Sequence, residues 1–348
     1  MNWITGCPCR WEQWRENVSN QAQLPETQLV ASDLGVVPNA HRFAHQAMAT
    51  TFEAIIQYED RSYAQQAARA AFDEVDRLEG HLSRFLETSD VTRINHLPAG
   101  QPVQLSLDTF ECLRISAEVC AGTGGAFDVT VGFLVDCWLD KEKKMPRTPT
   151  AEELRFARAH TGMDLILFDE PTHAVALVDS PVRVDLGGVG KGYAVDRMAD
   201  LLREWSIDRA LIHGGFSSVL ALDAPQGMVG WPVTLSHPRN RRRTLARVQL
   251  AGASVSGSGV EKGRHIIDPR TGEPAEGKSA TWSIAPDAAR ADALSTAFMI
   301  ITPDEVKDHC AGHPQVRALL ITQGREAESI GRIIPAGEWP PGELVDLT

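Results

Sequence analysis

The chain lacks a long apolar run and an excess of basic residues. None of its apolar stretches approaches the roughly 20 residues of a transmembrane helix, so we expect no membrane-spanning segment. Lys and Arg number 34 against 46 Asp and Glu, which gives a formal net charge of −12. Because nucleic acids and anionic membranes are bound by basic surfaces, this charge argues against both as partners. A phosphate-bearing ligand would then need a local device, such as a helix N-terminus, a lysine or a divalent cation.

The six cysteines lack the Cys-x-x-Cys spacing that is typical of zinc sites. Their scatter indicates reduced thiols and favours a cytoplasmic location. Residues 4–7, Ile-Thr-Gly-Cys, match the pattern of a bacterial lipoprotein cleavage site, but only three residues precede them and they follow no apolar segment. We therefore expect a cytoplasmic protein, with an exported lipoprotein as the alternative if the true start lies upstream.

The spacing of apolar residues predicts an α+β fold, with mixed sheets and flanking helices in one domain of two lobes with a cleft. Within the chain, residues 1–43 are expected to form an irregular extension, 44–335 the domain and 336–348 a tail. Residues 83–95 are expected to form a polar connection and 253–259 a glycine-rich segment. Helices are expected at 62–86 with Ser62 as cap, 106–122, 150–162 and 288–301, and from Pro303 onward. Strands are expected at 51–58, 164–168, 173–178, 182–185, 209–212, 218–222, 232–236, 245–250 and 316–321.

Residues 185–196, Asp-Leu-Gly-Gly-Val-Gly-Lys-Gly-Tyr-Ala-Val-Asp, are the most informative stretch. A strand is expected before them and a helix after them, so the glycines and Lys191 lie on a strand-to-helix turn. Backbone amides at a helix N-terminus bind anions, and glycine lets a ligand approach them closely. The spacing fits neither a P-loop nor a dinucleotide fingerprint. The stretch indicates a phosphate cradle, and the alternative is a glycine-rich turn that packs a helix on a sheet.

Three further positions carry chemistry, each with a structural alternative. Asp292 and Thr296 lie four residues apart on one helix face and offer hard oxygen ligands for Mg²⁺, or are a solvated Asp and a helix-satisfied Thr. His265 beside Asp268 is a candidate general base or a turn histidine. Asp128 follows a glycine-rich run and either recognises a ligand ring nitrogen or caps the turn.

The order of these motifs resembles the ApbE family of FAD:protein FMN transferases over about residues 44 to 325. The two blocks near the C-terminus, His-Ile-Ile-Asp-Pro-Arg-Thr-Gly at 265–272 and Ala-Asp-Ala-Leu-Ser-Thr at 291–296, are the most specific. The resemblance also rests on Met48-Ala-Thr50, Ser83-Arg-Phe85, Ser89, Ile94-Asn95, Gly125-Ala-Phe-Asp-Val-Thr130, the stretch 185–196, Gly214-Gly215 and Ser256-Gly257.

The resemblance implies a Mg²⁺-dependent enzyme that cleaves the pyrophosphate of FAD. It would transfer FMN to a threonine hydroxyl of an acceptor flavoprotein as a phosphoester and release AMP. Asp292 and Thr296 would bind Mg²⁺ together with the backbone carbonyl of Gly188. His265 would be the base for the acceptor hydroxyl, with Asp268 beside it. The residues implied to line the FAD site are Met48, Asn95, Asp128, Lys191 and Ser256.

The chain differs from the family pattern around two glycine pairs. His213 precedes Gly214-Gly215 where the family usually has Asn, and Phe216 follows where it usually has Asp or Asn. After Ser256-Gly257, Val260 stands near the place of the usual aromatic residue. Two other functions stay open from the sequence: an FAD pyrophosphatase that gives FMN and AMP, and a flavin-binding protein without turnover.

Overall fold

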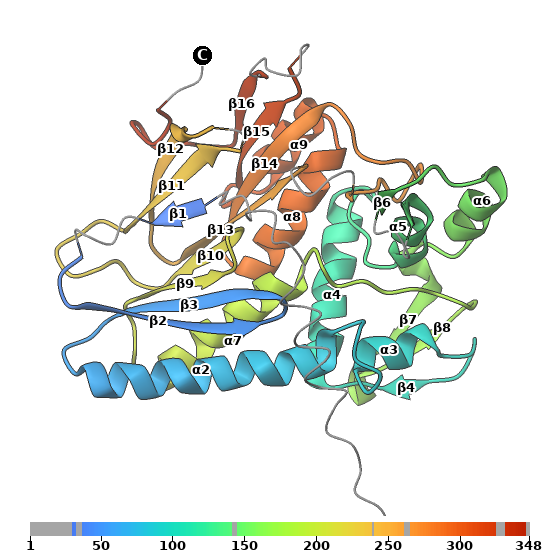
Figure 1. Cartoon of the computed structure of the whole chain (residues 1–348), viewed down its shortest axis with the longest axis horizontal. Coiled ribbons are helices and arrows are strands. Elements are labelled where there is room, and N and C mark those ends of the chain that lie inside the picture. The colour runs from blue at the N-terminus through green and yellow to red at the C-terminus, as the bar shows by residue number, and fades with distance from the viewer. Residues whose placement is uncertain are drawn as a thin grey trace, which may run out of the picture.

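The computed structural model describes residues 30–32, 37–140, 145–238, 240–260, 265–324 and 331–345 (Figure 1). The prediction of an irregular extension at 1–43 lies largely outside these residues. Within them, β1 (Val30–Ser32) and β2 (Ala40–Ala47) are strands, so regular structure begins before residue 44. No described helix is long and apolar enough to cross a membrane.

An antiparallel sheet of eight strands organises the larger lobe. The strand order is β16-β15-β14-β13-β10-β9-β3-β2, and each neighbouring pair is antiparallel. Strands far apart in sequence therefore become neighbours at the centre of the sheet, where β10 lies between β9 and β13. The remaining strands of this sheet are β3 (Thr50–Gln57), β9 (Ala210–Gly214), β10 (Ser218–Ala221), β13 (Ala253–Gly259), β14 (Lys278–Ala285), β15 (Arg317–Thr322) and β16 (Ile333–Ala336).

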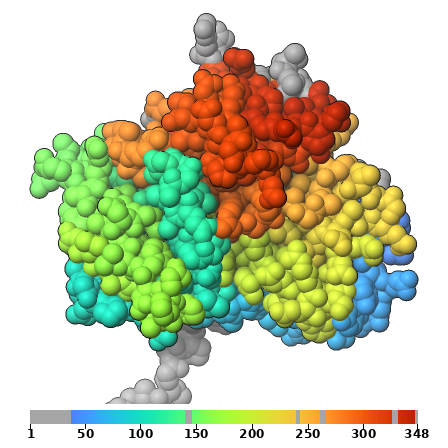
Figure 2. Space-filling model, turned by 180° about the vertical axis from the view of Figure 1, so that it is seen from behind, coloured from blue at the N-terminus to red at the C-terminus, as the bar shows by residue number. Residues whose placement is uncertain are grey.

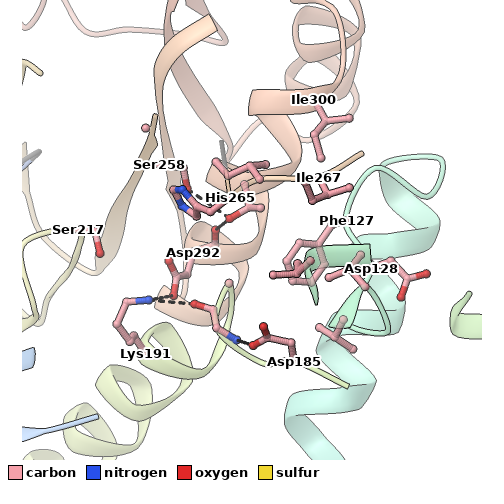
Figure 3. A pocket seen from close by; sticks show the side chains of 18 of the residues that line it. Phe127, Asp128, Asp185, Lys191, Ser217, Ser258, His265, Ile267, Asp292 and Ile300 are labelled. Carbon is pink, nitrogen blue, oxygen red and sulfur yellow. Dashed lines mark hydrogen bonds and ion pairs between the residues drawn. The ribbon is translucent and has the colours of Figure 1, made fainter. Parts of the chain in front are cut away.

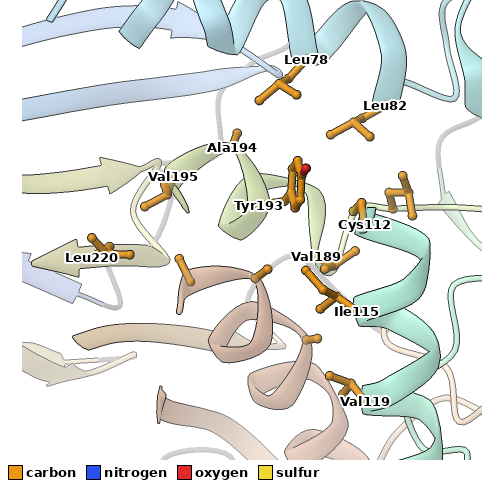
Figure 4. Close-up of a cluster of buried hydrophobic side chains, with 14 of the residues drawn as sticks. Leu78, Leu82, Cys112, Ile115, Val119, Val189, Tyr193, Ala194, Val195 and Leu220 are labelled. Atoms are coloured by element: carbon orange, nitrogen blue, oxygen red, sulfur yellow. The ribbon is translucent and has the colours of Figure 1, made fainter. Parts of the chain in front are cut away.

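Helices cover one face of this sheet. The helix α2 (Arg61–Leu82) buries a stripe that is rich in alanine, namely Ala64, Ala67, Ala68, Ala71, Phe72, Val75, Leu78 and Leu82. Small side chains let α2 pack closely on α7 (Gly190–Glu204), and α7 in turn packs on α8 (Ala288–Ile300). Figure 4 shows the apolar cluster where α2, α4 and α7 meet, with Tyr193 near its centre and Leu78 above it on α2. Each fully buried Leu or Val of such a cluster contributes about 1.5–3 kcal/mol.

The opposite face of the sheet packs against a smaller sheet of β1, β11 (Trp231–His237) and β12 (Asn240–Leu250). Trp231 and Trp282 are fully buried between the two layers. The tail that was predicted at 336–348 contributes to this region. Glu343 forms an ion pair with Arg317 at 2.6 Å, and its carbonyl accepts a hydrogen bond from the Arg247 amide.

The smaller lobe contains a three-stranded sheet of β4 (Val103–Gln104), β7 (Ile166–Asp169) and β8 (Ala174–Leu177). The helices α3 (Asp90–Asn95), α5 (Gly132–Trp138) and α6 (Ala151–Ala159) and the pair β5 (Leu139–Asp140) and β6 (Met145–Pro146) belong to it. The helix α4 (Leu107–Gly122) runs between the lobes, as the teal column in Figure 2 shows. The α+β fold expected from the sequence is confirmed. The sheets were expected to be mixed, whereas the strand pairs of the described sheets are all antiparallel.

Local signals predicted most helices well. Ser106 caps α4, a capping box of Thr150 and Glu153 opens α6, and α9 (Pro303–Gly312) follows α8. The cap of α2 was predicted wrongly, because Asp60 rather than Ser62 accepts the first amides. The connection predicted at 83–95 contains α3, which begins after the Ser89 cap.

Strand predictions failed where pairing partners decide the structure. Residues 253–259 form β13, although their glycines and serines carry little strand propensity, because β10 and β14 flank them on both sides. The long strands β2 and β14 were not predicted, nor were the short strands β1, β4, β5, β6 and β16. Residues 182–185 form no strand, and only Arg183 makes a single bridge, to Val131.

Candidate active site

A cleft of about 580 Å³ lies between the two lobes and collects most of the predicted site residues (Figure 3). The larger lobe contributes the β2–β3 turn, the cradle before α7, the β9–β10 turn, the end of β13 and one face of α8. The facing wall carries Phe127, Val135 and Leu139 from the smaller lobe. The cleft therefore joins a polar wall with helix termini to an apolar wall, a combination that suits a ligand with both charged and ring groups.

The cradle is held in shape by its own polar groups. The Asp185 carboxylate accepts a hydrogen bond from the Gly187 amide at 2.9 Å and pairs with Arg84 at 3.1 Å. Lys191 Nζ donates to the Gly187 carbonyl at 3.0 Å, which places the ammonium group at the floor of the cleft. A side chain at Gly188 would crowd the Phe127 ring at 3.2 Å, so glycine keeps the backbone open here.

Asp292 lies beside this lysine although 100 residues separate them. Its Oδ2 lies 3.7 Å from Lys191 Nζ and accepts a hydrogen bond from the Gly192 amide at 3.2 Å. Burial raises the pKa of Asp292, whereas the Lys191 charge and the Gly192 amide lower it. The carboxylate therefore depends on nearby positive charge to remain ionised in a buried position.

The Thr296 hydroxyl lies one helical turn beyond Asp292 and faces the same cleft. Its Oγ1 lies 3.4 Å from the Asp292 carbonyl and 3.3 Å from the Ser258 hydroxyl. A β-carbon built on Gly188 would lie 3.4 Å from the same hydroxyl, so the cradle backbone and α8 nearly touch here. One carboxylate, one hydroxyl and a backbone segment thus converge.

This donor set fits a hard divalent cation such as Mg²⁺, which prefers oxygen ligands and keeps some of its waters. Among the described residues, no group of three or more His, Cys, Asp or Glu is placed to hold a metal ion. A cation at this place would therefore be held by mixed oxygen donors and not by a cluster of ionisable side chains.

The predicted general base His265 and its neighbour Asp268 are placed differently. His265 is exposed and lines the cleft, on the wall that carries Ser258 and Asp292 (Figure 3). The Asp268 carboxylate is bound by the Arg270 guanidinium through two contacts of 2.9 Å, and Asp268 is not among the described residues that line the cleft. It also accepts a hydrogen bond from the Arg270 amide at 3.0 Å and so stabilises the turn after His265.

Of the residues implied to bind FAD, Met48, Asp128 and Lys191 line the cleft. Met48 lies in the β2–β3 turn with φ of 48°, and its amide donates to Glu79 at 2.9 Å. The Asp128 carboxylate accepts hydrogen bonds from Thr130, and burial raises its pKa. The Met163 amide donates to the other carboxylate oxygen at 3.0 Å, so both oxygens already accept hydrogen bonds within the protein.

Asn95 and Ser256 lie behind the described lining of the cleft. Asn95 clamps the backbone of Val184, because its Nδ2 donates to the carbonyl at 3.1 Å and its Oδ1 accepts from the amide at 2.6 Å. That backbone leads directly into the cradle. Ser256 is fully buried in β13 opposite Ser218, and its hydroxyl has no hydrogen-bond partner among the described residues. The neighbouring Ser218 hydroxyl faces Asp292 and lowers the pKa of that carboxyl group.

Sequence reasoning gave no role to Ser258, Arg84 or Phe216, and all three line the cleft. The signal for Ser258 is its position two residues after Ser256, since alternate residues of a strand share a face. That signal is usable only once 253–259 is recognised as a strand. Phe216 keeps 38% of its surface exposed.

Comparisons with known proteins identify the family of this chain. The model of the ApbE family matches residues 48–320. An FAD:protein FMN transferase of Klebsiella pneumoniae is 32% identical over 257 residues, which cover 69% of this chain and 71% of that protein. One from Escherichia coli K12 is 31% identical over 245 residues, or 65% of this chain and 68% of the relative.

Solved structures show the same fold. The ApbE protein of Thermotoga maritima superposes with a TM-score of 0.75 at 27% identity, covering 85% of this chain and 97% of its own. The flavin transferase ApbE from Vibrio cholerae gives a TM-score of 0.73 at 22% identity with the same coverage. Since the family model spans most of the sequence and the folds agree, the chain belongs to the ApbE family.

Proposed function

We propose that this chain is an FAD:protein FMN transferase, which moves FMN from FAD to a threonine hydroxyl of an acceptor flavoprotein. The observation that carries the proposal is that Lys191, Asp292 and Thr296 line one cleft beside the N-terminus of α7. The family relatives bear this activity in their names. The cytoplasmic location stays a prediction.

We further propose that Asp292, Thr296 and the Gly188 carbonyl hold Mg²⁺. When bound, the ion neutralises charge on the pyrophosphate and on the departing phosphate. The residues of the chain do the remaining work. Lys191 offers a full positive charge beside the cradle amides, so the pyrophosphate is bound locally despite the acidic chain. Phosphoryl-type transfer needs mainly such positioning and charge stabilisation.

In the reaction, the acceptor hydroxyl oxygen forms a bond to the FMN phosphorus. The bond between that phosphorus and the bridging oxygen breaks, and AMP leaves with the bridging oxygen. His265 lies on the exposed side of the cleft, where an acceptor chain can reach it, and takes the hydroxyl proton. Asp268 supports this role indirectly, because it holds the following turn through Arg270.

Mass spectrometry of a flavoprotein domain with a modifiable threonine, incubated with this protein, FAD and Mg²⁺, tests the proposal. We expect the mass of one FMN on threonine, equimolar AMP, and no reaction in EDTA. Free FMN and AMP with an unmodified acceptor would identify a hydrolase instead. Unchanged FAD would identify a flavin-binding protein without turnover.

Two variants separate the proposed roles. Asp292→Asn should abolish the Mg²⁺-dependent cleavage of FAD, and full activity would contradict the metal assignment. His265→Gln should lower kcat for transfer by about 100-fold or more while KM for FAD stays unchanged, as expected for a lost general base. An equal loss of FAD binding would make His265 structural.

A further inference from the structure

The contact between α7 and α8 is unusually close and joins the two halves of the candidate site. A β-carbon at Gly192 would lie 2.1 Å from the Ala288 carbonyl oxygen, so the two backbones touch. The helix α7 carries Lys191 and the cradle, whereas α8 carries Asp292 and Thr296. The relative placement of these helices therefore sets the geometry between the cradle and the carboxylate.

Asp196, four residues after Gly192 on the same face of α7, fixes this contact. Its two carboxylate oxygens accept hydrogen bonds from the amides of Ala288 at 2.7 Å and Ala289 at 2.8 Å. These are the first two amides of α8, which have no partner within their own helix. The helix's own cap, Asp287, serves the amide of Arg290 at 2.8 Å. Asp196 thus completes the cap of α8 from a different helix.

Both carboxylate oxygens of Asp196 are occupied by these hydrogen bonds. Asp196 is partly buried, and burial raises its pKa to about 7, with the charges of Asp287 and Asp200 acting in the same direction. The two α8 amides lower that pKa, so the ionised form depends on them. Because each carboxylate oxygen accepts a hydrogen bond from one amide, α8 can neither rotate nor slide on α7 without breaking one of these two hydrogen bonds.

Asp292 lies one helical turn after Ala288, and Thr296 lies two turns after it. The anchor that Asp196 forms at the start of α8 is therefore close to both residues of the site. We propose that Asp196 is a positioning residue, which holds α8 in register with the cradle so that Asp292 and Thr296 stand opposite Lys191 and Gly188. The inference rests on the proposed function for its link to activity. The anchor itself is a property of the fold that is measured without FAD.

The test compares Asp196→Asn and Asp196→Ala with the control Asp200→Asn. Asparagine keeps the volume but only one acceptor, and its amide group faces a donor. Asp200 lies one turn further along α7 and pairs with Arg197 at 2.7 Å and Arg203 at 3.1 Å within that helix. The control therefore removes a carboxylate of α7 that makes no hydrogen bond to Ala288 or Ala289 and affects Asp196 only through its charge.

Two readouts are needed. Hydrogen exchange of the Ala288 and Ala289 amides should be accelerated in both Asp196 variants and unchanged in the control. Calorimetric titration with Mg²⁺ alone should show an affinity lowered about tenfold or more, as is usual when a group that orients metal ligands is lost, with the control within about twofold. If Asp196→Ala fails to fold, Asp196→Asn carries both measurements.

The outcomes are distinct. Unchanged exchange, or a lower melting temperature with unchanged Mg²⁺ affinity, would overturn the positioning role. If the wild-type protein binds no Mg²⁺ and transfers no FMN while exchange at Ala288 and Ala289 still responds to Asp196, the proposed function fails and the link from the anchor to a metal site fails with it. Faster exchange together with weaker Mg²⁺ binding would establish the anchor as part of the site's construction.

Discussion

Replacing Gly192 by alanine tests the close packing of α7 on α8 most directly. The new β-carbon would lie 2.1 Å from the Ala288 carbonyl oxygen and 2.9 Å from the Ala289 α-carbon. Ordinary contacts between heavy atoms lie near about 3.5 Å, so the helices would have to separate by about 1 Å. The atoms that the new β-carbon would meet belong to the backbone of α8, which cannot move aside as the end of a flexible side chain can.

Two effects oppose each other in this variant. Alanine in a helix is more favourable than glycine by about 1 kcal/mol, whereas overpacking a close contact costs about 1–3 kcal/mol and sometimes more. We expect the overpacking to outweigh the gain in helix propensity, so Gly192→Ala should lower the free energy of unfolding by up to about 2 kcal/mol. The Gly192 amide also donates to Asp292, so FAD cleavage should fall as well.

Gly80 in α2 provides the matched control, because a β-carbon there meets no atom within 4 Å. Gly80→Ala should gain about 0.5–1 kcal/mol from helix propensity alone. Urea unfolding followed by circular dichroism measures both variants, and FAD cleavage measures the site. Equal unfolding free energies for the two variants would refute the reasoning that α7 and α8 touch at Gly192.

Three further predictions concern residues around the cleft. Burial lowers the pKa of His213 to about 4, so the folded state keeps it neutral while the unfolded chain takes a proton below about pH 6.5. The free energy of unfolding should therefore fall by about 3 kcal/mol as the pH drops from 6.5 to 4. His213→Asn should reduce this dependence on pH, and parallel curves of unfolding free energy against pH for the variant and the wild type would contradict the prediction. Asn95→Ala should cost about 1–3 kcal/mol in urea unfolding, because the Val184 amide and carbonyl lose their partner, and a change below about 0.5 kcal/mol would argue against the clamp. Lys191→Gln should raise KM for FAD about tenfold or more through the lost charge, and an unchanged KM would remove the lysine from the pyrophosphate site.

The sequence alone predicted the elements whose signals are local. The cap at Ser106 and the capping box of Thr150 and Glu153 lie within a few residues of the helices they begin, so spacing was enough to find them. The residue types of the candidate site were also readable. Asp292 and Thr296 share a helix face, and the glycines around Lys191 mark a strand-to-helix turn.

The tertiary structure decided which of these residues meet. Asp292 approaches Lys191 only because α8 packs on α7. Asp268 was expected beside His265, but its carboxylate is bound by Arg270. Which of these two residues it meets depends on how the turn folds. No periodicity in the chain carries that information, since periodicity reports a face and not its partner.

The strands show the same division. Residues 253–259 were predicted as a glycine-rich segment because their own propensity is weak, yet two neighbouring strands pair with them and form β13. That pairing buries Ser256 and turns Ser258 to the cleft. Composition, caps and helical faces are local properties that the chain itself determines. Sheet neighbours, helix contacts and the partners of buried carboxylates depend on segments up to 100 residues apart, and only the packed structure brings them together.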